Sequence, residues 1–148
     1  MWATTYEMDK EYSTNYHSGL RNWIKCVQKK DLAVAGALTD PKGVRGLSPS
    51  QQPDPDIYVH VVEKRSDGIV VNGAKVMIAG VASCHEVFVM PTLGLREANR
   101  DYAVAFAVPR NVEGSTIVEA NSRVTQGKVR KDLIRQWRSE EYPRHTYS

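Results

Sequence analysis

The chain has 148 residues, of which 41% are hydrophobic and 25% charged, and its formal net charge is +3. This composition is ordinary for a soluble domain, and the length favours a single domain with its own core. No apolar run reaches the roughly 18 residues that a membrane span needs, and no secretion leader is recognisable. We therefore expect a cytoplasmic protein without a membrane partner.

The two cysteines, Cys26 and Cys84, lie 58 positions apart in the sequence. Neither has another Cys or a His at the spacing of metal ligands, so we expect no metal site and no disulfide. Both are interpreted as core thiols.

An amphipathic helix is predicted over residues 14–30, preceded by a shorter helical segment at residues 5–12. Either Thr14 or Asn15 is placed to cap the longer helix. The apolar side chains that recur at helical spacing are Tyr16, Leu20, Trp23, Ile24 and Val27.

Short strands separated by turn signals follow, a pattern typical of an antiparallel sandwich or barrel. The dipeptides Asp67-Gly68 and Asn72-Gly73 predict two tight hairpins. The loop at 46–56 contains three prolines and is expected to be irregular and solvated. The predicted strands cover residues 32–38, 57–64, 69–71, 74–82, 86–91, 102–108 and 116–120.

The last segment is basic, with seven Lys or Arg against three acidic residues between Arg123 and Arg144. Residues 128–138 predict a helix with one apolar face. A basic helix can bind nucleic acid or an acidic membrane surface, but a solvated face on a docked helix is the more frequent case. We expect no nucleic-acid partner.

A possible cofactor site lies where the first predicted strand runs into Thr39-Asp40-Pro41-Lys42-Gly43. A hydroxyl, a carboxylate, a cation and the backbone N–H groups of a turn then lie together, which suits an anionic cofactor. Taken alone, the same residues are more typical of a plain type I turn, and only their pairing with a second motif favours the cofactor site.

Two segments resemble the middle domain of the acyl-CoA dehydrogenase-like flavoproteins, and within that group the 4-hydroxyphenylacetate 3-hydroxylase family. The stretch 37–43 resembles its T-[DE]-P-x-x-G turn, and 67–80 resembles its D-G-x-x-[LV]-N-G-x-K-x-x-I-T hairpin. Further stretches are similar to the 4-hydroxybutyryl-CoA dehydratase branch, and the resemblance covers Thr4 to Pro109. These stretches include Gly46-Leu47-Ser48-Pro49-Ser50, Ser83-Cys84-His85-Glu86 and Val89-Met90-Pro91-Thr92.

The resemblance implies a mainly β fold, an antiparallel β-barrel of the acyl-CoA dehydrogenase middle-domain type. We expect an N-terminal helical segment at 1–31, the flavin-binding-type barrel at 32–122, and a basic helical tail at 123–148 outside the family match. It also implies FAD as cofactor. The residues matching the family's flavin-contacting segments are Leu38, Thr39, Asp40, Pro41, Lys42, Gly43, Arg45, Ile78, Ala79 and Gly80.

The chain departs from the family pattern at Ala79, where the family usually has a threonine that hydrogen-bonds the flavin. Met77 likewise stands where the dehydratase branch usually has a polar residue. The branch's [4Fe-4S] cluster ligands lie outside the matched region, so we expect neither that cluster nor a catalytic residue in this chain.

The resemblance therefore implies a fragment of a flavoenzyme that dehydrates 4-hydroxybutyryl-CoA. A 4-hydroxyphenylacetate 3-monooxygenase-type enzyme and a non-catalytic, partner-binding relic of the barrel remain open. The implied partners are FAD, an acyl-CoA or phenolic substrate, and either further copies of the chain or separate helical domains. We expect the 148-residue chain alone to be inactive.

Overall fold

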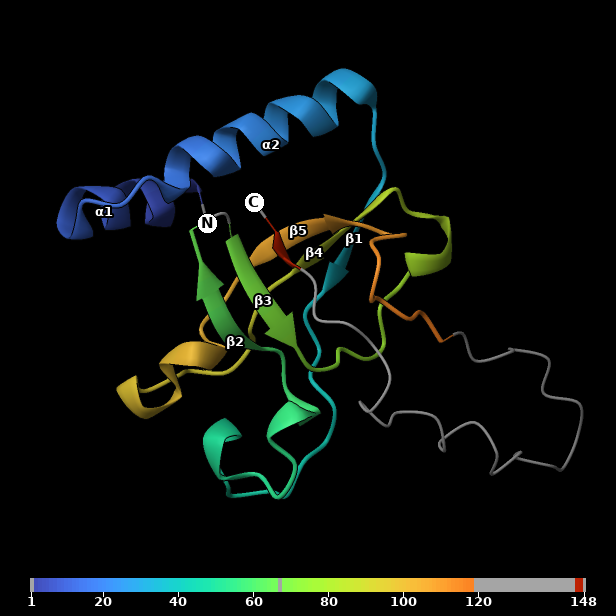
Figure 1. The fold of residues 1–148 in the computed structure, drawn as a ribbon. Helices are drawn as coiled ribbons and strands as arrows, with labels where there is room; N and C mark the ends of the chain where they lie inside the picture. Colours follow the sequence, from blue (N-terminus) through green and yellow to red (C-terminus); the bar gives the residue numbers. More distant parts are fainter. Residues whose placement is uncertain (1, 67, 119–145, 148) are drawn as a thin grey trace, which may run out of the picture. The chain divides into compact units, whose positions relative to one another are not determined.

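The computed structural model describes residues 2–66, 68–118 and 146–147. It forms two compact units, Met1–Ala33 and Val34–Ser148. The first unit is helical and the second carries the β-structure (Figure 1).

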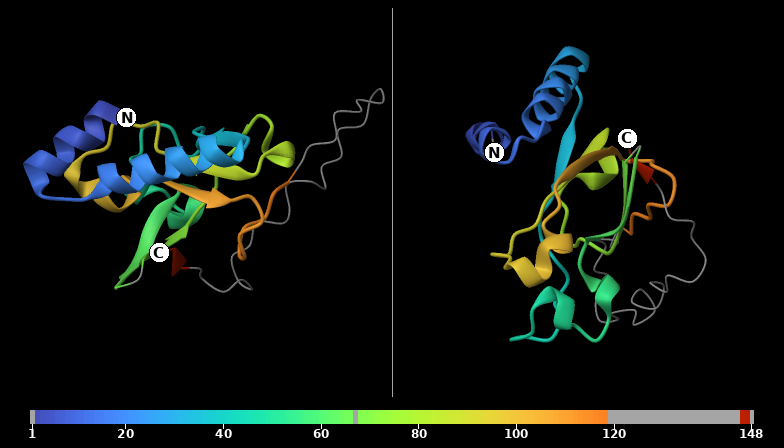
Figure 2. Two further views of the ribbon diagram at one scale, coloured as in Figure 1. Left: turned by 90° about the horizontal axis from the view of Figure 1, so that it is seen from above. Right: turned by 60° about the vertical axis from the view of Figure 1, so that its left-hand side comes forward.

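The helical unit consists of α1 (Trp2–Tyr12) and α2 (Tyr16–Lys30), which pack against each other as a helical hairpin (Figure 2). Both predicted helices are confirmed. One detail is wrong, because Tyr16, expected on the apolar face, is 64% exposed. Within this unit the apolar side chains of α2 are at most half-buried.

A side chain from α1, rather than Thr14 or Asn15, caps the start of α2. The two carboxylate oxygens of Asp9 accept hydrogen bonds from the backbone N–H groups of Tyr16 (2.9 Å) and His17 (2.8 Å). Thr14 instead donates its hydroxyl to Asp9 (2.6 Å), which orients the carboxylate. The cap therefore also ties α1 to α2, a long-range link that local capping rules do not reveal.

One sheet of the second unit has the order β1-β4-β5 and contains β1 (Val34–Ala37), β4 (Glu86–Val89) and β5 (Phe106–Pro109). β1 runs parallel to β4, and β5 runs antiparallel to it. Alternate residues of the three strands face the core, as a period of two requires. The buried strand residues are Ala35, Ala37, Val87, Val89 and Val108.

The other sheet has the order β2-β3-β6 and is antiparallel, with β2 (His60–Arg65), β3 (Gly68–Asn72) and β6 (Thr146–Tyr147). The predicted hairpin between β2 and β3 is confirmed. The described residues thus form two separate sheets, one of them mixed, and the closed antiparallel barrel is not confirmed. A parallel β1–β4 pair is possible because the long connection between these strands allows a crossover.

The second predicted hairpin and the strand at 74–82 are wrong. β3 ends at Asn72, and Gly73 adopts a φ of +124° where its backbone passes against Tyr58 and Val59. A Cβ at Gly73 would lie 2.4 Å from the Tyr58 carbonyl oxygen, so only glycine fits this crossing. A single parallel bridge joins Tyr58 to Ala74, after which the chain leaves the sheet.

Other predictions fail in detail. Residues 97–102 form a 3-10 segment, so the strand predicted at 102–108 begins only at Phe106. The loop at 46–56 contains 3-10 turns beginning at Pro49 and Pro55, with Pro49 and Gln52 buried. Residues 116–118 form no strand, and 119–120 and the basic helix predicted at 128–138 lie outside the described residues. None of the described helices is long and apolar enough to span a membrane.

Asp9 gives the helical unit a testable pH dependence. Desolvation opposes its ionisation, but the hydrogen bonds from Thr14, His17 and Tyr16 outweigh it and lower the Asp9 pKa below 3.8. A lowered pKa stabilises the folded state above pH 3.8 and ceases to do so as the pH falls through the folded value. We expect Asp9→Ala to lower the thermal midpoint of the helical signal at pH 7, with a deficit that shrinks below pH 3.8.

The measurement is circular dichroism at 222 nm across a pH series, with Glu7→Ala in the same helix as the control. A deficit for Asp9→Ala that is equally large at pH 7 and pH 3 would contradict the capping role of the carboxylate.

Candidate functional site

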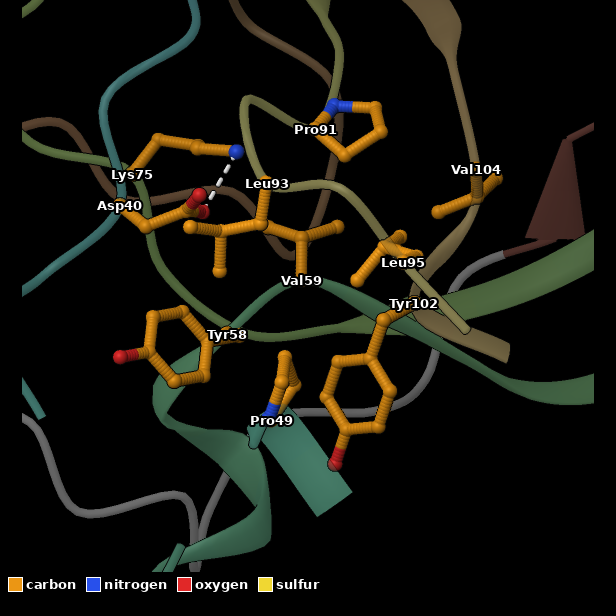
Figure 3. Close-up of a pocket in the computed structure, with 10 residues that line it drawn as sticks. All are labelled: Asp40, Pro49, Tyr58, Val59, Lys75, Pro91, Leu93, Leu95, Tyr102 and Val104. Atoms are coloured by element: carbon orange, nitrogen blue, oxygen red, sulfur yellow. Dashed lines mark hydrogen bonds and ion pairs between the residues drawn. The ribbon is translucent and has the colours of Figure 1, made fainter. Parts of the chain in front are cut away.

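The centre of the site is a buried ion pair between Lys75 and Asp40, 2.5 Å apart (Figure 3). The Lys75 side chain is only 6% exposed and that of Asp40 12%. The Lys75 ammonium also donates to the backbone carbonyls of Leu38 (3.0 Å) and Met90 (2.9 Å). Its three hydrogens therefore have three acceptors, as a buried ammonium requires.

Asp40 extends this network to a third stretch of chain. Its other carboxylate oxygen accepts a hydrogen bond from the Thr92 hydroxyl (3.2 Å). Next to the pair, the Val76 backbone N–H donates to the Thr39 carbonyl (2.9 Å). The network thus joins 38–40, which follows β1, to 75–76 and to 90–92, which follows β4.

These contacts bring together the two segments that the sequence singled out. They also change the interpretation of two predicted cofactor residues, because the Asp40 carboxylate and the Leu38 carbonyl are bonded within the protein. Lys75 was not predicted as a site residue. A signal was available in the sequence, because the first motif contains the acid Asp40 and the second contains the lysine Lys75. Since the two motifs were expected to lie together, these two residues could have been paired.

A small cavity lies beside the ion pair. Figure 3 shows Tyr58, Tyr102, Leu93 and Leu95 around it. Its volume is about 10 Å³, the space of a single water molecule. This cavity is too small to hold a cofactor or a substrate.

Residues 38–44 form an irregular segment and not the predicted hydrogen-bonded turn, which occurs at Arg45 and Gly46 instead. Lys42 and Arg45 are both exposed. Neither forms an ion pair within residues 2–66, 68–118 and 146–147. The turn is held from below by Gln52, which accepts from the Val44 N–H (2.8 Å) and donates to the Val44 and Leu47 carbonyls (both 3.2 Å). The Val44 N–H is therefore not available to a cofactor.

A side chain at Gly43 would displace the side chains of Gln52 and Tyr58. A Cβ there would lie 2.4 Å from the Gln52 amide oxygen and 2.8 Å from the Tyr58 hydroxyl. The sequence predicted Gly43 as part of an anion-binding segment. In the structure it also leaves space for the side chains of Gln52 and Tyr58. Pro41 is half-buried and Thr39 exposed.

The second predicted segment, 78–80, is open to solvent on one side. Ile78 packs against the core, whereas Ala79 is exposed and Gly80 (φ +73°) has nothing within 4 Å of an added Cβ. Met77 precedes them with a φ of +56° and a side chain that is 89% exposed. A non-glycine residue in this left-handed region is uncommon, and it changes the direction of the chain just before 78–80.

A cluster that sequence reasoning missed lies at the start of β2. The His60 ring packs against Tyr102 (centroids 5.0 Å apart), and its nitrogens lie 3.0 Å from the Tyr58 carbonyl and 3.6 Å from Asp56. Desolvation, followed by the charges of Asp56 and Asp101, raises the Tyr102 pKa. Since Tyr102 also donates to the Pro55 carbonyl (3.2 Å), the cluster fastens the loop before β2.

No metal centre was found in the part of the chain that the structure describes, where no three His, Cys, Asp or Glu side chains converge. Cys84 is buried, with its thiol 3.2 Å from the Val81 carbonyl, and Cys26 is half-buried. Glu86 begins β4, and the carbonyl of the preceding His85 accepts a hydrogen bond from the Arg110 N–H (3.0 Å).

Residues 1–142 match the profile of the 4-hydroxyphenylacetate 3-hydroxylase N-terminal region. The chain belongs to this family. The match includes most of the basic segment from 123 onward, which the motifs alone left outside the resemblance.

The chain is 52% identical over 114 residues to the 4-hydroxybutyryl-CoA dehydratase/vinylacetyl-CoA-Delta-isomerase of Clostridium aminobutyricum. The aligned region covers 77% of this chain and 23% of that protein. Its structure is similar to an oxygen-tolerant archaeal 4-hydroxybutyryl-CoA dehydratase from N. maritimus, with a TM-score of 0.73 and 39% identity over 75% of this chain and 22% of the other.

It is also similar to the oxygenase component of 4-hydroxyphenylacetate 3-monooxygenase in complex with FAD. The TM-score is 0.63 at 36% identity, over 74% of this chain and 22% of the other. The chain thus spans less than a quarter of the length of these relatives.

The ion pair makes a prediction about stability. Lys75→Met leaves the Asp40 carboxylate buried without its cation, which we expect to lower the free energy of unfolding by about 3–5 kcal/mol. Lys64→Met, at an exposed position of β2, should change it by less than about 0.5 kcal/mol. Urea denaturation of both variants measures the difference.

The double variant Asp40→Ala/Lys75→Met separates the pair from general packing. It should lose much less stability than the sum of the two single variants, because neither charge then remains buried alone. Additive losses, or a Lys75→Met variant as stable as Lys64→Met, would show that the pair is not coupled.

Proposed function

We propose that this chain provides one wall of the FAD site in a flavoenzyme of the 4-hydroxybutyryl-CoA dehydratase type, which acts on 4-hydroxybutyryl-CoA. The observation that carries the proposal is the direct linkage of the two flavin-type motifs through Lys75, Asp40 and the Val76–Thr39 hydrogen bond. The 52% identity to the Clostridium dehydratase supports this branch.

The residues at the wall fit a flavin in two respects. The open space above Gly80 and the exposed Ala79 leave room for a flat ring to lie against the backbone. Lys42 and Arg45 offer exposed cations of the kind that a diphosphate requires. The tiny internal cavity agrees with a ligand that lies on the wall and not inside it.

In this proposal the flavin supplies the redox chemistry, and the protein segments have separate tasks. Ile78, Ala79 and Gly80 support the ring by backbone contact, and Thr39, Lys42 and Arg45 face the ligand from the segment 38–45. Leu38, Asp40, Pro41 and Gly43 shape that segment. No residue of the chain is assigned a catalytic step.

The remainder of the pocket would come from parts of the relatives' length that this chain does not span, or from another subunit. We propose that this larger assembly completes a closed β-barrel and is a homo-oligomer. It would also bind the acyl-CoA or phenolic substrate. Exclusion of water from the flavin depends on such a cover, because the wall is open on its outer side.

A 4-hydroxyphenylacetate 3-monooxygenase-type activity is the second candidate. The specific observation in its favour is the similarity to that enzyme's oxygenase component, whose structure was solved with FAD. The lower TM-score, 0.63 against 0.73 for the archaeal dehydratase, makes it the weaker candidate. A partner-binding module without flavin would instead give a colourless protein.

Ala79 gives the test of this proposal. The 148-residue chain should bind FAD weakly and form no crotonyl-CoA from 4-hydroxybutyryl-CoA, because the wall alone does not enclose the ring. Ala79→Thr adds one hydroxyl beside the proposed ring position, so FAD should bind more tightly by about 0.5–1.5 kcal/mol without turnover appearing.

Flavin binding is measured by quenching of FAD fluorescence, and product by an anaerobic assay after reconstitution with FAD and iron-sulfide. The control is Ala82→Thr, the same change at another exposed position. An equal effect of both substitutions would argue against the wall, and product above the protein-free control would refute the inactivity of the chain.

A further inference from the structure

The helical unit contains an open groove between α1 and α2 that the proposed flavin wall does not use. Its volume is about 500 Å³, within the range of small-molecule sites. Three cationic side chains line it, Lys10 from α1 and Arg21 and Lys25 from α2. We call this feature the basic groove.

Most of its cationic charge has no carboxylate partner. In the described part of the chain, the ion pairs involve His60, Arg65, Lys75 and Arg100, and none involves Lys10, Arg21 or Lys25. Helix α2 contains no acidic residue at all. Cations that face a groove without partners attract an anionic ligand.

Asp9 is the one carboxylate that lines the groove, and its oxygens are already engaged. They accept hydrogen bonds from Thr14 and from the N–H groups of Tyr16 and His17. This arrangement also means that the N-terminus of α2 is capped and does not itself provide the anion site. The binding capacity of the groove therefore lies in its side chains.

Those side chains are partly positioned in advance. The Lys10 ammonium lies 4.4 Å from the centroid of the Tyr6 ring, whose edge meets His17 at a centroid distance of 5.5 Å. Arg21 and Lys25 lie four residues apart and so share one face of α2. Tyr6 is 50% exposed and leaves part of its ring surface open to a ligand.

We propose that the basic groove binds the phosphate groups of CoA, a ligand whose phosphates the flavin wall does not need. Arginine and lysine together suit phosphate oxygens, and the groove is much larger than inorganic phosphate alone would need. The choice of nucleotide rests on the proposed function, whereas the recognition of phosphate rests on the groove itself.

The test is a titration of the full 148-residue chain, labelled with ¹⁵N, with CoA, dephospho-CoA, FAD, riboflavin, inorganic phosphate and polyglutamate. CoA should shift the backbone amides of 15–25, and riboflavin should not. CoA should act more strongly than dephospho-CoA and FAD, which lack its third phosphate, and an equal or stronger effect of FAD at 15–25 would overturn the proposal.

The variant Arg21→Gln/Lys25→Gln should weaken nucleotide binding at least about tenfold, because it removes two cations that contact the phosphates. Lys29→Gln/Lys30→Gln is the matched control, because it removes the same charge from the last turn of α2, outside the groove. Arg21→Lys/Lys25→Arg should retain binding.

Equal weakening in the control variant, or no shift of 15–25 by any nucleotide, would overturn the proposal. Shifts with polyglutamate alone would overturn it in favour of an acidic protein partner, and equal effects of phosphate and nucleotides would reduce it to an adventitious ion only. If FAD causes no shifts at 39–45 and 78–80 while CoA still shifts 15–25, the flavin wall is refuted and the groove proposal stands.

Discussion

The buried ion pair of Lys75 and Asp40 is the interaction on which the described β-unit depends. It connects the ends of β1 and β4 to the segment that follows β3, and its bonds join residues 15 to 37 positions apart in the sequence. Such a pair gains little net free energy, because desolvation offsets the attraction of the charges. Its effect is that only one arrangement of these three stretches satisfies all of its hydrogen bonds.

This constraint explains why two motifs with different local structure occur together. The segment 38–43 contributes no residue to the apolar core, whereas Ile78 packs against it. Lys75, three residues before Ile78, holds 38–43 by directional bonds to Leu38 and Asp40. A wall built in this way can expose its backbone to a ligand while its underside stays fixed by Gln52, Tyr58 and the ion pair.

Much of the fold follows from local sequence signals, and the failures have identifiable causes. The helices and the β2–β3 hairpin were predictable because apolar periodicity and the Asp-Gly turn act over short distances. The strand at 74–82 failed because its alternation competes with two tertiary constraints, the close crossing at Gly73 and the burial of Lys75. The Asp9 cap was missed because the donor and acceptor lie on different helices.

The site was predictable in its location and only partly in the roles of its residues. Resemblance to the family located both segments, but Asp40 and Gly43 serve packing and bonding within the protein, which no local pattern distinguishes from ligand contact. Lys75 could have been assigned only by pairing one motif with the other. The basic groove was not predicted from the sequence because its cations come from two different helices.

The most direct measurement is amide hydrogen exchange at Val76, whose N–H bonds to the Thr39 carbonyl beside the ion pair. If the pair holds the two segments together, Lys75→Met should accelerate this exchange at least about tenfold under conditions where the chain stays folded. Exchange at Val87 and Val89 in the core strands should change much less. Unchanged protection at Val76, or equal acceleration at all three amides, would contradict the account.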